Sequence, residues 1–67
     1  MVGKMVEKVL LDSLRNHKTI TIIYMKESGI IQRRIQVIKI EDRYIRALDK
    51  DKNSFRTFKI SNILSAR

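Results

Sequence analysis

The chain has 67 residues, with 15 Lys plus Arg against 7 Asp plus Glu, and it contains no cysteine. This length allows one domain, spanning residues 1–67, and the missing cysteines exclude disulfides and thiolate metal sites. The net charge of +8 indicates an anionic partner, either nucleic acid or a membrane surface. Because so small a domain buries only about 60% of the surface that its unfolded chain exposes, we expect a homo-oligomer.

No apolar run reaches the roughly 20 residues that a membrane span needs. Lys4, Glu7 and Lys8 interrupt the apolar residues of the N-terminal segment, which is unlike a signal peptide. The sequence therefore predicts a cytoplasmic protein without a membrane partner. A single histidine cannot build a transition-metal site by itself, and we expect no metal and no cofactor.

Residues 2–16 are predicted to form an amphipathic helix, since apolar residues recur at spacings of three and four. These apolar residues are Val2, Val6, Val9, Leu10 and Leu14. Asn16 is the expected left-handed cap of this helix. Glu7 and Asp12 dilute the basic face that membrane binding requires, so we expect the helix to pack on the core or to form a dimer seam.

After the helix, β-branched and aromatic residues predict short antiparallel strands joined by tight turns. Gly29 can take the positive φ of the first hairpin, and Ser61-Asn62 can start one helical turn. Apolar residues change face between Val37 and Ile38, which indicates a bulge. The expected strands are residues 19–26, 30–40, 43–49, 54–60 and 63–66.

These elements predict a mainly β fold. The N-terminal helix is followed by a small, strongly bent, four- or five-stranded antiparallel β-barrel. Because the bent second strand folds the sheet over onto itself, the barrel is expected to be partly open. The helix would cover one open end.

The sequence offers no grouping of residues typical of catalysis. Its glycines, Gly3 and Gly29, make no phosphate-binding loop, and His17 follows the helix in a position typical of a helix-end residue. Asp49 and Asp51 flank Lys50 and indicate a solvated turn rather than an acid–base pair. We therefore expect no enzymatic activity.

Basic residues on the predicted strands carry more information. Arg33 and Arg34 are adjacent, so they point to opposite faces of their strand. Arg56 has the parity of a core residue, and a core-facing charge is costly unless it is paired. Two readings stay open for Arg56: a structural ion pair with Asp49 or Glu41, or a cationic floor for an anionic ligand.

Tyr44 shares its strand face with Arg46, which sets a stacking ring beside a guanidinium group. That combination is typical of single-stranded nucleic-acid binding, with phosphate contacts from Arg and Lys supplying affinity. The arginines are expected to gather around Tyr44. The predicted residues for binding single-stranded DNA, RNA or a nucleotide ligand are Arg33, Arg34, Tyr44, Arg46, Arg56 and Lys59.

A second hypothesis is a protein-interaction module. The chain contains no proline, so no proline protects a sheet edge. An edge strand could then accept a partner strand, while the basic face docks an acidic protein or regulator.

The strands also resemble the WYL domain family, through an ordered set of landmarks that covers nearly the whole chain. The landmarks are Ile20-Thr21-Ile22-Ile23-Tyr24, Gly29, Arg34-Ile35, Tyr44-Ile45 and Arg56-x-Phe58-x-Ile60-x-x-Ile63. The resemblance implies a helix before an Sm-like barrel, and regulation of transcription or phage defence. It also implies binding of nucleic acid or nucleotide-like ligands at Arg34, Tyr44 and Arg56.

The chain departs from the WYL pattern at several positions. Arg43 stands where the family has Trp, Ile45 stands for its Leu, and Val37 replaces a usual proline. The helix-turn-helix that commonly precedes the domain is also missing. The resemblance therefore implies a stand-alone domain rather than a conventional transcription factor.

The layout is similar, too, to that of the Sm-like RNA chaperones of the bacterial host-factor type. Leu10-Leu11-x-x-Leu14 before the strands and Ile60-x-x-Ile63 near the end carry this similarity. It implies RNA-binding rings in which strands of neighbouring subunits pair. Both resemblances imply the same architecture.

Overall fold

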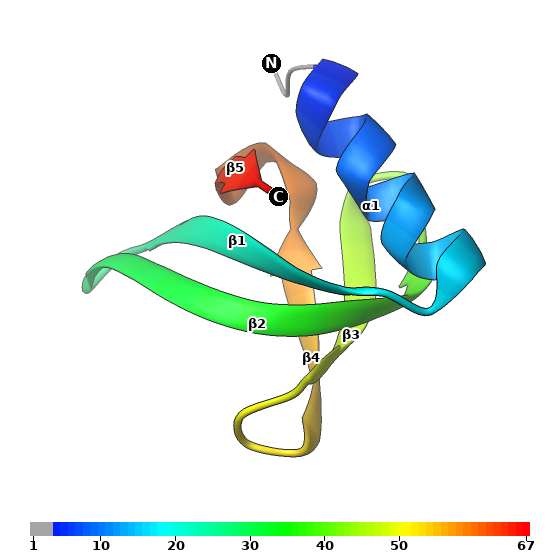
Figure 1. The fold of residues 1–67 in the computed structure, drawn as a ribbon. Helices are drawn as coiled ribbons and strands as arrows, with labels where there is room; N and C mark the ends of the chain where they lie inside the picture. The colour runs from blue at the N-terminus through cyan, green and yellow to red at the C-terminus, as the bar shows by residue number, and fades with distance from the viewer. Residues whose placement is uncertain (1–3) are drawn as a thin grey trace.

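The computed structural model describes residues 4–67 and contains one helix followed by five strands (Figure 1). Helix α1 spans Lys4–Asn16, so residues 2 and 3 of the predicted helix lie outside the described residues. A short 3₁₀ helix, η1 (Ile60–Asn62), precedes the last strand, as the sequence predicts. The strands are β1 (Thr19–Lys26), β2 (Gly29–Ile40), β3 (Tyr44–Asp49), β4 (Ser54–Lys59) and β5 (Ile63–Ala66).

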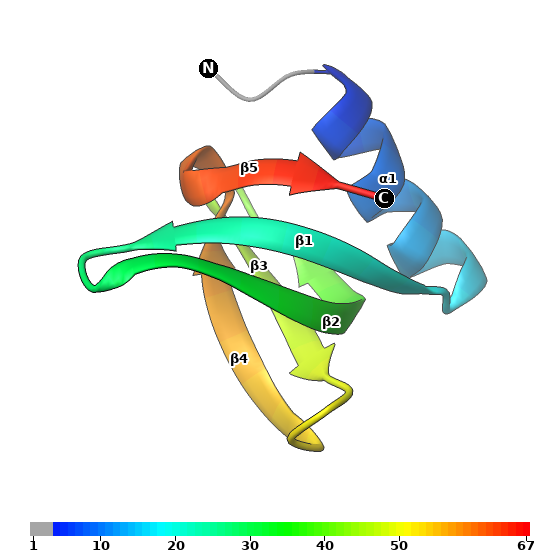
Figure 2. The same cartoon turned by 60° about the vertical axis from the view of Figure 1, so that its left-hand side comes forward.

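The five strands form one antiparallel sheet of order β4-β3-β2-β1-β5. Successive hairpins place β2, β3 and β4 on one side of β1, and β5 returns to its other side. Figures 1 and 2 show β3 and β4 running across the direction of β1 and β2. The predicted mainly β fold with an N-terminal helix is confirmed.

The sheet is not closed into a barrel, so of the predicted partly open barrel the structure shows only the bent antiparallel sheet. β4 and β5 are the two edges of the sheet. β5 has only four residues and pairs along them with β1. Within the described residues it therefore makes no ladder with β4, and the sheet stays open between its edges.

A bulge in β2 produces part of the bend. The register between β2 and β3 shifts between Val37 and Lys39, which leaves Ile38 as the extra residue. This confirms the bulge that the apolar pattern predicts at that point. Because a bulge bends its strand and increases the local twist, β3 and β4 fold over the apolar face of β1 and β2.

The core lies on one face of the sheet, which we call the inner face, and α1 packs on it through contacts with β1, β2 and β5. The opposite face is the outer face. The buried apolar side chains are Val6, Leu10, Ile20, Ile22, Ile35, Val37, Ile45, Ala47, Phe58, Ile63 and Ala66. The helix thus packs on the core, one of its two expected roles. Within residues 4–67, no helix has the length and apolar character to cross a membrane.

The end of α1 differs from expectation in two ways. His17, with φ of 55°, is the left-handed residue, whereas Asn16 belongs to the helix and donates a side-chain hydrogen bond to Asp12. Ser13 is fully buried, where it donates to the Lys18 carbonyl at 2.6 Å and accepts from the Val37 N–H at 2.9 Å. The sequence pattern does not identify Ser13, which ties the helix to β2.

Candidate nucleic-acid interface

The strand register divides the predicted binding residues between the two faces of the sheet. Arg33 lies opposite the buried Ile22, and Arg56 lies opposite the buried Ala47, so both belong to the inner face. The other four belong to the outer face: Arg34, Tyr44, Arg46 and Lys59. Arg33 and Arg56 therefore do not gather around Tyr44, because strand parity points them to the opposite side.

Tyr44, Arg46 and Lys59 meet on β3 and β4 as neighbours. Tyr44 pairs directly with Lys59, and Arg46 pairs with Lys39 on β2 on its other side. Phe55 joins them, since the Arg46 guanidinium carbon lies 6.0 Å from the centroid of its ring. We call these five residues the outer patch.

The two aromatic rings of the outer patch face solvent. Tyr44 is 44% exposed and Phe55 is 60% exposed. Exposed rings on a sheet surface can stack with unpaired bases, while flanking cations contact the phosphates. The outer patch can therefore bind a single strand without reading its sequence.

Phe55 is not among the binding residues predicted from the sequence, although its position in the strand indicates that its side chain is exposed. It is three residues from Phe58, so the two side chains of β4 point to opposite faces. Phe58 is in the core, and Phe55 must then lie outside it. A large exposed apolar side chain beside a cation is a feature that parity alone could reveal.

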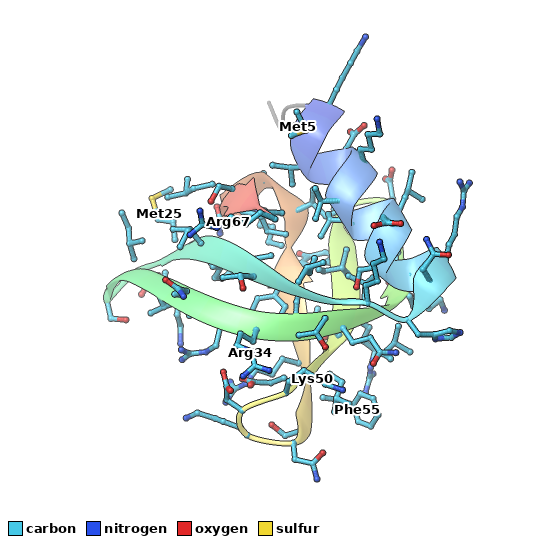
Figure 3. The ribbon with its side chains drawn as sticks, in the orientation of Figure 1. Met5, Met25, Arg34, Lys50, Phe55 and Arg67 are labelled. Atoms are coloured by element: carbon cyan, nitrogen blue, oxygen red, sulfur yellow. The ribbon has the colours of Figure 1, made fainter. Side chains whose placement is uncertain are left out.

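Arg34 lies on the outer face but at the end near the β3–β4 loop, beside Lys50 (Figure 3). It is more than half exposed and pairs with the exposed Asp51 at 3.2 Å. The register places Arg34 two strand positions beyond the residue that pairs with Leu48, which itself pairs with Phe55. Arg34 thus extends the basic surface from Phe55 toward the loop rather than contacting Tyr44.

The inner face holds a different arrangement around Asp49, which has no exposed surface. Its Oδ1 accepts hydrogen bonds from the N–H groups of Asp51 and Lys52, both at 3.1 Å. Its Oδ2 accepts from Arg56 Nε at 3.0 Å and lies 3.7 Å from Arg33 Nε. We call Asp49, Arg33 and Arg56 the Asp49 cluster.

The Asp49 cluster bears on two predictions from the sequence. The predicted ion pair between Arg56 and Asp49 is confirmed. The reading of Asp49 as part of a solvated turn is wrong, because its side chain turns inward to meet that charge and to cap the loop. For Asp51 the prediction of a solvated turn residue is confirmed, because its side chain is exposed.

Opposing effects act on the pKa of the Asp49 carboxyl. Burial raises this pKa, while hydrogen bonds from the Lys52 and Asp51 N–H groups and the nearby Arg56 charge lower it. The lowering effects together prevail, so the pKa lies below the ordinary value of 3.8. Asp49 is therefore a stable anion at neutral pH and is unsuited to accept a proton as a catalytic base.

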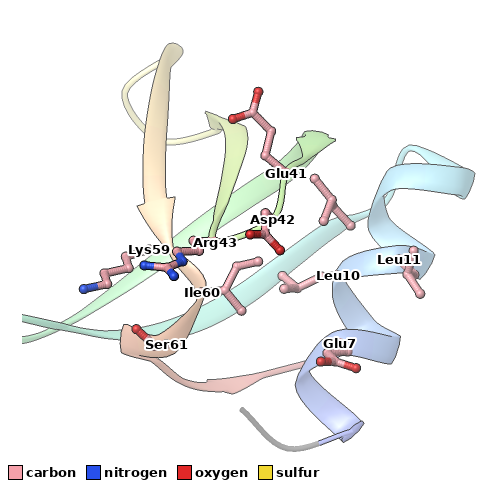
Figure 4. A pocket seen from close by; sticks show the side chains of 10 residues that line it. Glu7, Leu10, Leu11, Glu41, Asp42, Arg43, Lys59, Ile60 and Ser61 are labelled. Atoms are coloured by element: carbon pink, nitrogen blue, oxygen red, sulfur yellow. The ribbon is translucent and has the colours of Figure 1, made fainter. Parts of the chain in front are cut away.

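A cavity of about 590 Å³ lies between α1 and the β2–β3 turn (Figure 4). Leu10 and Ile60 contribute apolar surface to it, and charged side chains of both signs line it: the carboxylates Glu7, Glu41 and Asp42 and the cations Arg43 and Lys59. The formal balance of one negative charge does not favour phosphate. Lys59 also belongs to the outer patch, so the cavity adjoins the outer patch at that residue.

Residues 4–67 contain no cluster of three or more His, Asp or Glu side chains that could hold a metal ion. No family model matches the chain, and no curated protein matches it either. The WYL and Sm-like resemblances therefore stay predictions.

Proposed function

We propose that the protein is a small, non-enzymatic nucleic-acid-binding regulatory protein that binds single strands on its outer patch. The observation that carries this proposal is the position of the Arg46 guanidinium over the exposed ring of Phe55. Tyr44 and Lys59 lie side by side further along the same face. Rings and cations alternate there in the way that single-strand binding requires.

The spacing of the two rings suits separate bases. Phe55 pairs with Leu48, four strand positions from the Tyr44–Lys59 pair. At about 3.3 Å per residue this separation is roughly 13 Å. Phe55 and Tyr44 would stack with different bases, while Arg46, Lys39 and Lys59 contact the phosphates between and beside them.

Fluorescence anisotropy with labelled single-stranded DNA and RNA tests the proposal. We expect Phe55→Ala to weaken binding by roughly 5-fold to 150-fold, since base stacking on a ring contributes about 1–3 kcal/mol. Arg46→Gln removes one phosphate contact, which lowers the slope of log affinity against log salt by about 0.7 for a single strand. Parallel titrations of DNA and RNA show which of the two binds more tightly.

Two matched controls lie on the helix, away from the sheet surface. Met5→Ala removes an exposed apolar side chain, as Phe55→Ala does, and Arg15→Gln removes one exposed charge, as Arg46→Gln does. Both should leave affinity and salt slope close to those of the unmodified protein. Equal effects of the patch and control variants would contradict binding at the outer patch.

We also propose that the chain is a WYL-like domain with an Sm-like fold, and that it self-associates. The order of a helix followed by a bent five-stranded sheet supports the first part. The edge strands β4 and β5, which lack a second neighbour within the described residues, support the second. Sedimentation velocity over a range of protein concentrations measures the subunit number, and a monomer at every concentration would contradict self-association.

A further inference from the structure

A second cavity, of about 330 Å³, opens between the β1–β2 hairpin and the edge strand β4. The hairpin contributes Tyr24, Lys26 and Arg33, and β4 contributes Arg56 and Phe58. The strand register places these side chains on the inner face. Phe55 and Thr57 of β4 also line the cavity, so it shares Phe55 with the outer patch, and the sheet separates it from the other four residues of that patch.

Positive charge is in excess around this cavity. Lys26, Arg33 and Arg56 bring three cations, and Asp49 brings one carboxylate. The formal balance is therefore two positive charges. Oδ2 of Asp49 accepts a hydrogen bond from Arg56, whereas Arg33 Nε, at 3.7 Å from the same oxygen, makes no hydrogen bond to it.

The two guanidinium groups have donors left for a ligand. Arg56 donates to Asp49 through Nε, which leaves its terminal nitrogens for another acceptor. One terminal nitrogen of Arg33 donates to the Gln32 carbonyl at 3.0 Å, and its Nε is buried and has no hydrogen-bond partner among residues 4–67. At 3.7 Å from Asp49 Oδ2, it is beyond ordinary hydrogen-bond length. A buried donor without an acceptor is costly, and a bound anion would remove that cost.

The cavity fits the phosphate monoester of a nucleotide. Such a group carries about −1.5 to −2 charge at neutral pH, which matches the excess of two positive charges, and guanidinium groups bind phosphate bidentately. The volume lies at the lower end of the roughly 300–1,000 Å³ typical of small-molecule sites. Tyr24 and Phe58, packed edge to face with ring centroids 5.0 Å apart, supply an apolar wall for the base or sugar.

We propose that this cavity is a binding site for a nucleotide phosphate monoester, held by Arg33 and Arg56 with Lys26 at its mouth. Asp49 is a positioning residue, because it fixes the guanidinium groups without contacting the ligand. Fixed guanidinium groups lose little freedom on binding, which favours affinity. The three cations of this site lie outside the outer patch, and the two sites share only Phe55, so variants of the cations test this site separately.

Isothermal titration calorimetry of the full chain with adenosine 5′-monophosphate, adenosine and inorganic phosphate tests the ligand. We expect saturable binding of the monophosphate, weaker binding of inorganic phosphate, and no measurable binding of adenosine. Adenosine binding as tightly as its monophosphate, or no saturable binding of either phosphate, would overturn the proposal.

Neighbouring arginines give a matched pair of variants for the same titration. Arg33→Gln should weaken binding of the monophosphate by roughly tenfold to a hundredfold, the usual effect of removing a charged hydrogen bond. Arg34→Gln removes the same charge from the opposite face and should change affinity by no more than about twofold, because exposed charges are screened. Equal losses in both variants would mean that only net charge matters, and the site would be wrong.

Because Arg33 also contacts Asp49, circular dichroism must show that Arg33→Gln is folded. If it is unfolded, Lys26→Gln supplies the result, since Lys26 is exposed and lies outside the hydrogen bonds of Asp49. A weakened affinity in folded Lys26→Gln supports the site, and an unchanged affinity contradicts it.

The monoester can belong to a free nucleotide or to the end of a strand. Oligonucleotides with a 5′-phosphate and with a 5′-hydroxyl distinguish these sources when both are tested in the outer-patch variant Arg46→Gln. Tighter binding of the 5′-phosphate oligonucleotide supports strand-end binding if the substitution Lys26→Gln abolishes the difference. Equal binding of the two oligonucleotides, together with saturable binding of the mononucleotide, supports a free ligand. If the Arg46→Gln variant no longer binds single strands but still binds the monophosphate, the outer patch and the cavity are separate binding sites.

Discussion

Arg33 and Arg34 are neighbours in the chain but lie on opposite faces of β2, in different surroundings. On the inner face, Arg33 is 3.7 Å from Asp49, which is fully buried. On the outer face, Arg34 is 3.2 Å from Asp51, and both side chains are more than half exposed. Water screens the closer, exposed pair, so it contributes little to stability, whereas removal of the buried Asp49 would leave the charges of Arg33 and Arg56 without their carboxylate. Burial, more than distance, decides what each arginine does.

The same contrast separates the two faces as binding surfaces. Arg33 and Arg56 are held by Asp49 and present few, fixed donors around a cavity. Arg46 and Lys59 lie on the outer face and are exposed to water. Fixed donors favour one small ligand of defined shape, whereas exposed cations beside rings favour a long and variable strand.

The largest expected effect comes from replacing the two aspartates. Asp49→Ala leaves two partly buried guanidinium groups without their carboxylate, which should lower the free energy of unfolding by roughly 3–5 kcal/mol. Asp51→Ala removes one exposed ion pair and should change it by about 0.5 kcal/mol. Urea denaturation followed by circular dichroism measures both values.

An Asp49→Ala protein that is unfolded without denaturant agrees with this expectation, since domains of this size are marginally stable. Similar stability losses in the two variants would remove the contrast between the faces. Asp49 would then be an ordinary turn residue.

The pH dependence of stability should also depend on the inner face. Because the pKa of Asp49 is lowered in the folded state, the unfolded chain binds the proton more strongly. The contribution of the ionised Asp49 carboxyl to stability is complete above the ordinary pKa of 3.8. This contribution is lost as the pH falls through the lower pKa of the folded state. Asp49→Asn should therefore be less stable at neutral pH, and its stability should fall less steeply below about pH 4.

A smaller acid-dependent loss should remain in Asp49→Asn. The pKa of Asp12 is also lowered, by side-chain hydrogen bonds from Asn16 and then Lys18 at the end of α1. Thermal unfolding at a series of pH values separates the two carboxyls. An unchanged acid dependence in Asp49→Asn would show that Asp49 does not control it.

Much of the fold follows from local patterns that the sequence carries openly. The helical spacing of Val6 and Leu10, the β-branched run before Gly29, and the shift of apolar parity at Val37 each depend on residues close together in the chain. Closure of the barrel depends on whether β4 and β5 meet, and that distance is set by the whole sheet. Local patterns hold no information about it.

The candidate site divides in a similar way. Strand parity predicts that Arg33 and Arg34 separate, that Arg46 accompanies Tyr44, and that Arg56 points inward. Strand parity does not predict that Asp49 is buried. Its carboxylate contacts guanidinium groups of two other strands, β2 and β4. Composition alone makes this turn look solvated.

The two tyrosines also lie on opposite faces of the sheet, and replacing them should change stability less than replacing the aspartates does. The Tyr24 hydroxyl, on the inner face, accepts a hydrogen bond from the Lys59 N–H at 2.9 Å, which links β1 to β4 across the open side of the sheet. Tyr24→Phe should lower the free energy of unfolding by about 1 kcal/mol. Tyr44→Phe alters an exposed hydroxyl on the outer face and should have almost no effect. Equal losses in urea denaturation would show that this link does not stabilise the sheet.

The smallest expected effect concerns the contact between Arg46 and Phe55. A cation placed 6.0 Å from a ring centroid at an exposed site contributes about 0.5–1 kcal/mol. A double-mutant cycle with Arg46→Gln, Phe55→Leu and the double variant measures this coupling in the free protein. Repeating the cycle with bound single strand distinguishes two uses of the ring. If a base stacks on Phe55, the guanidinium is displaced and the coupling in stability falls, whereas an unchanged coupling would mean that the strand binds elsewhere.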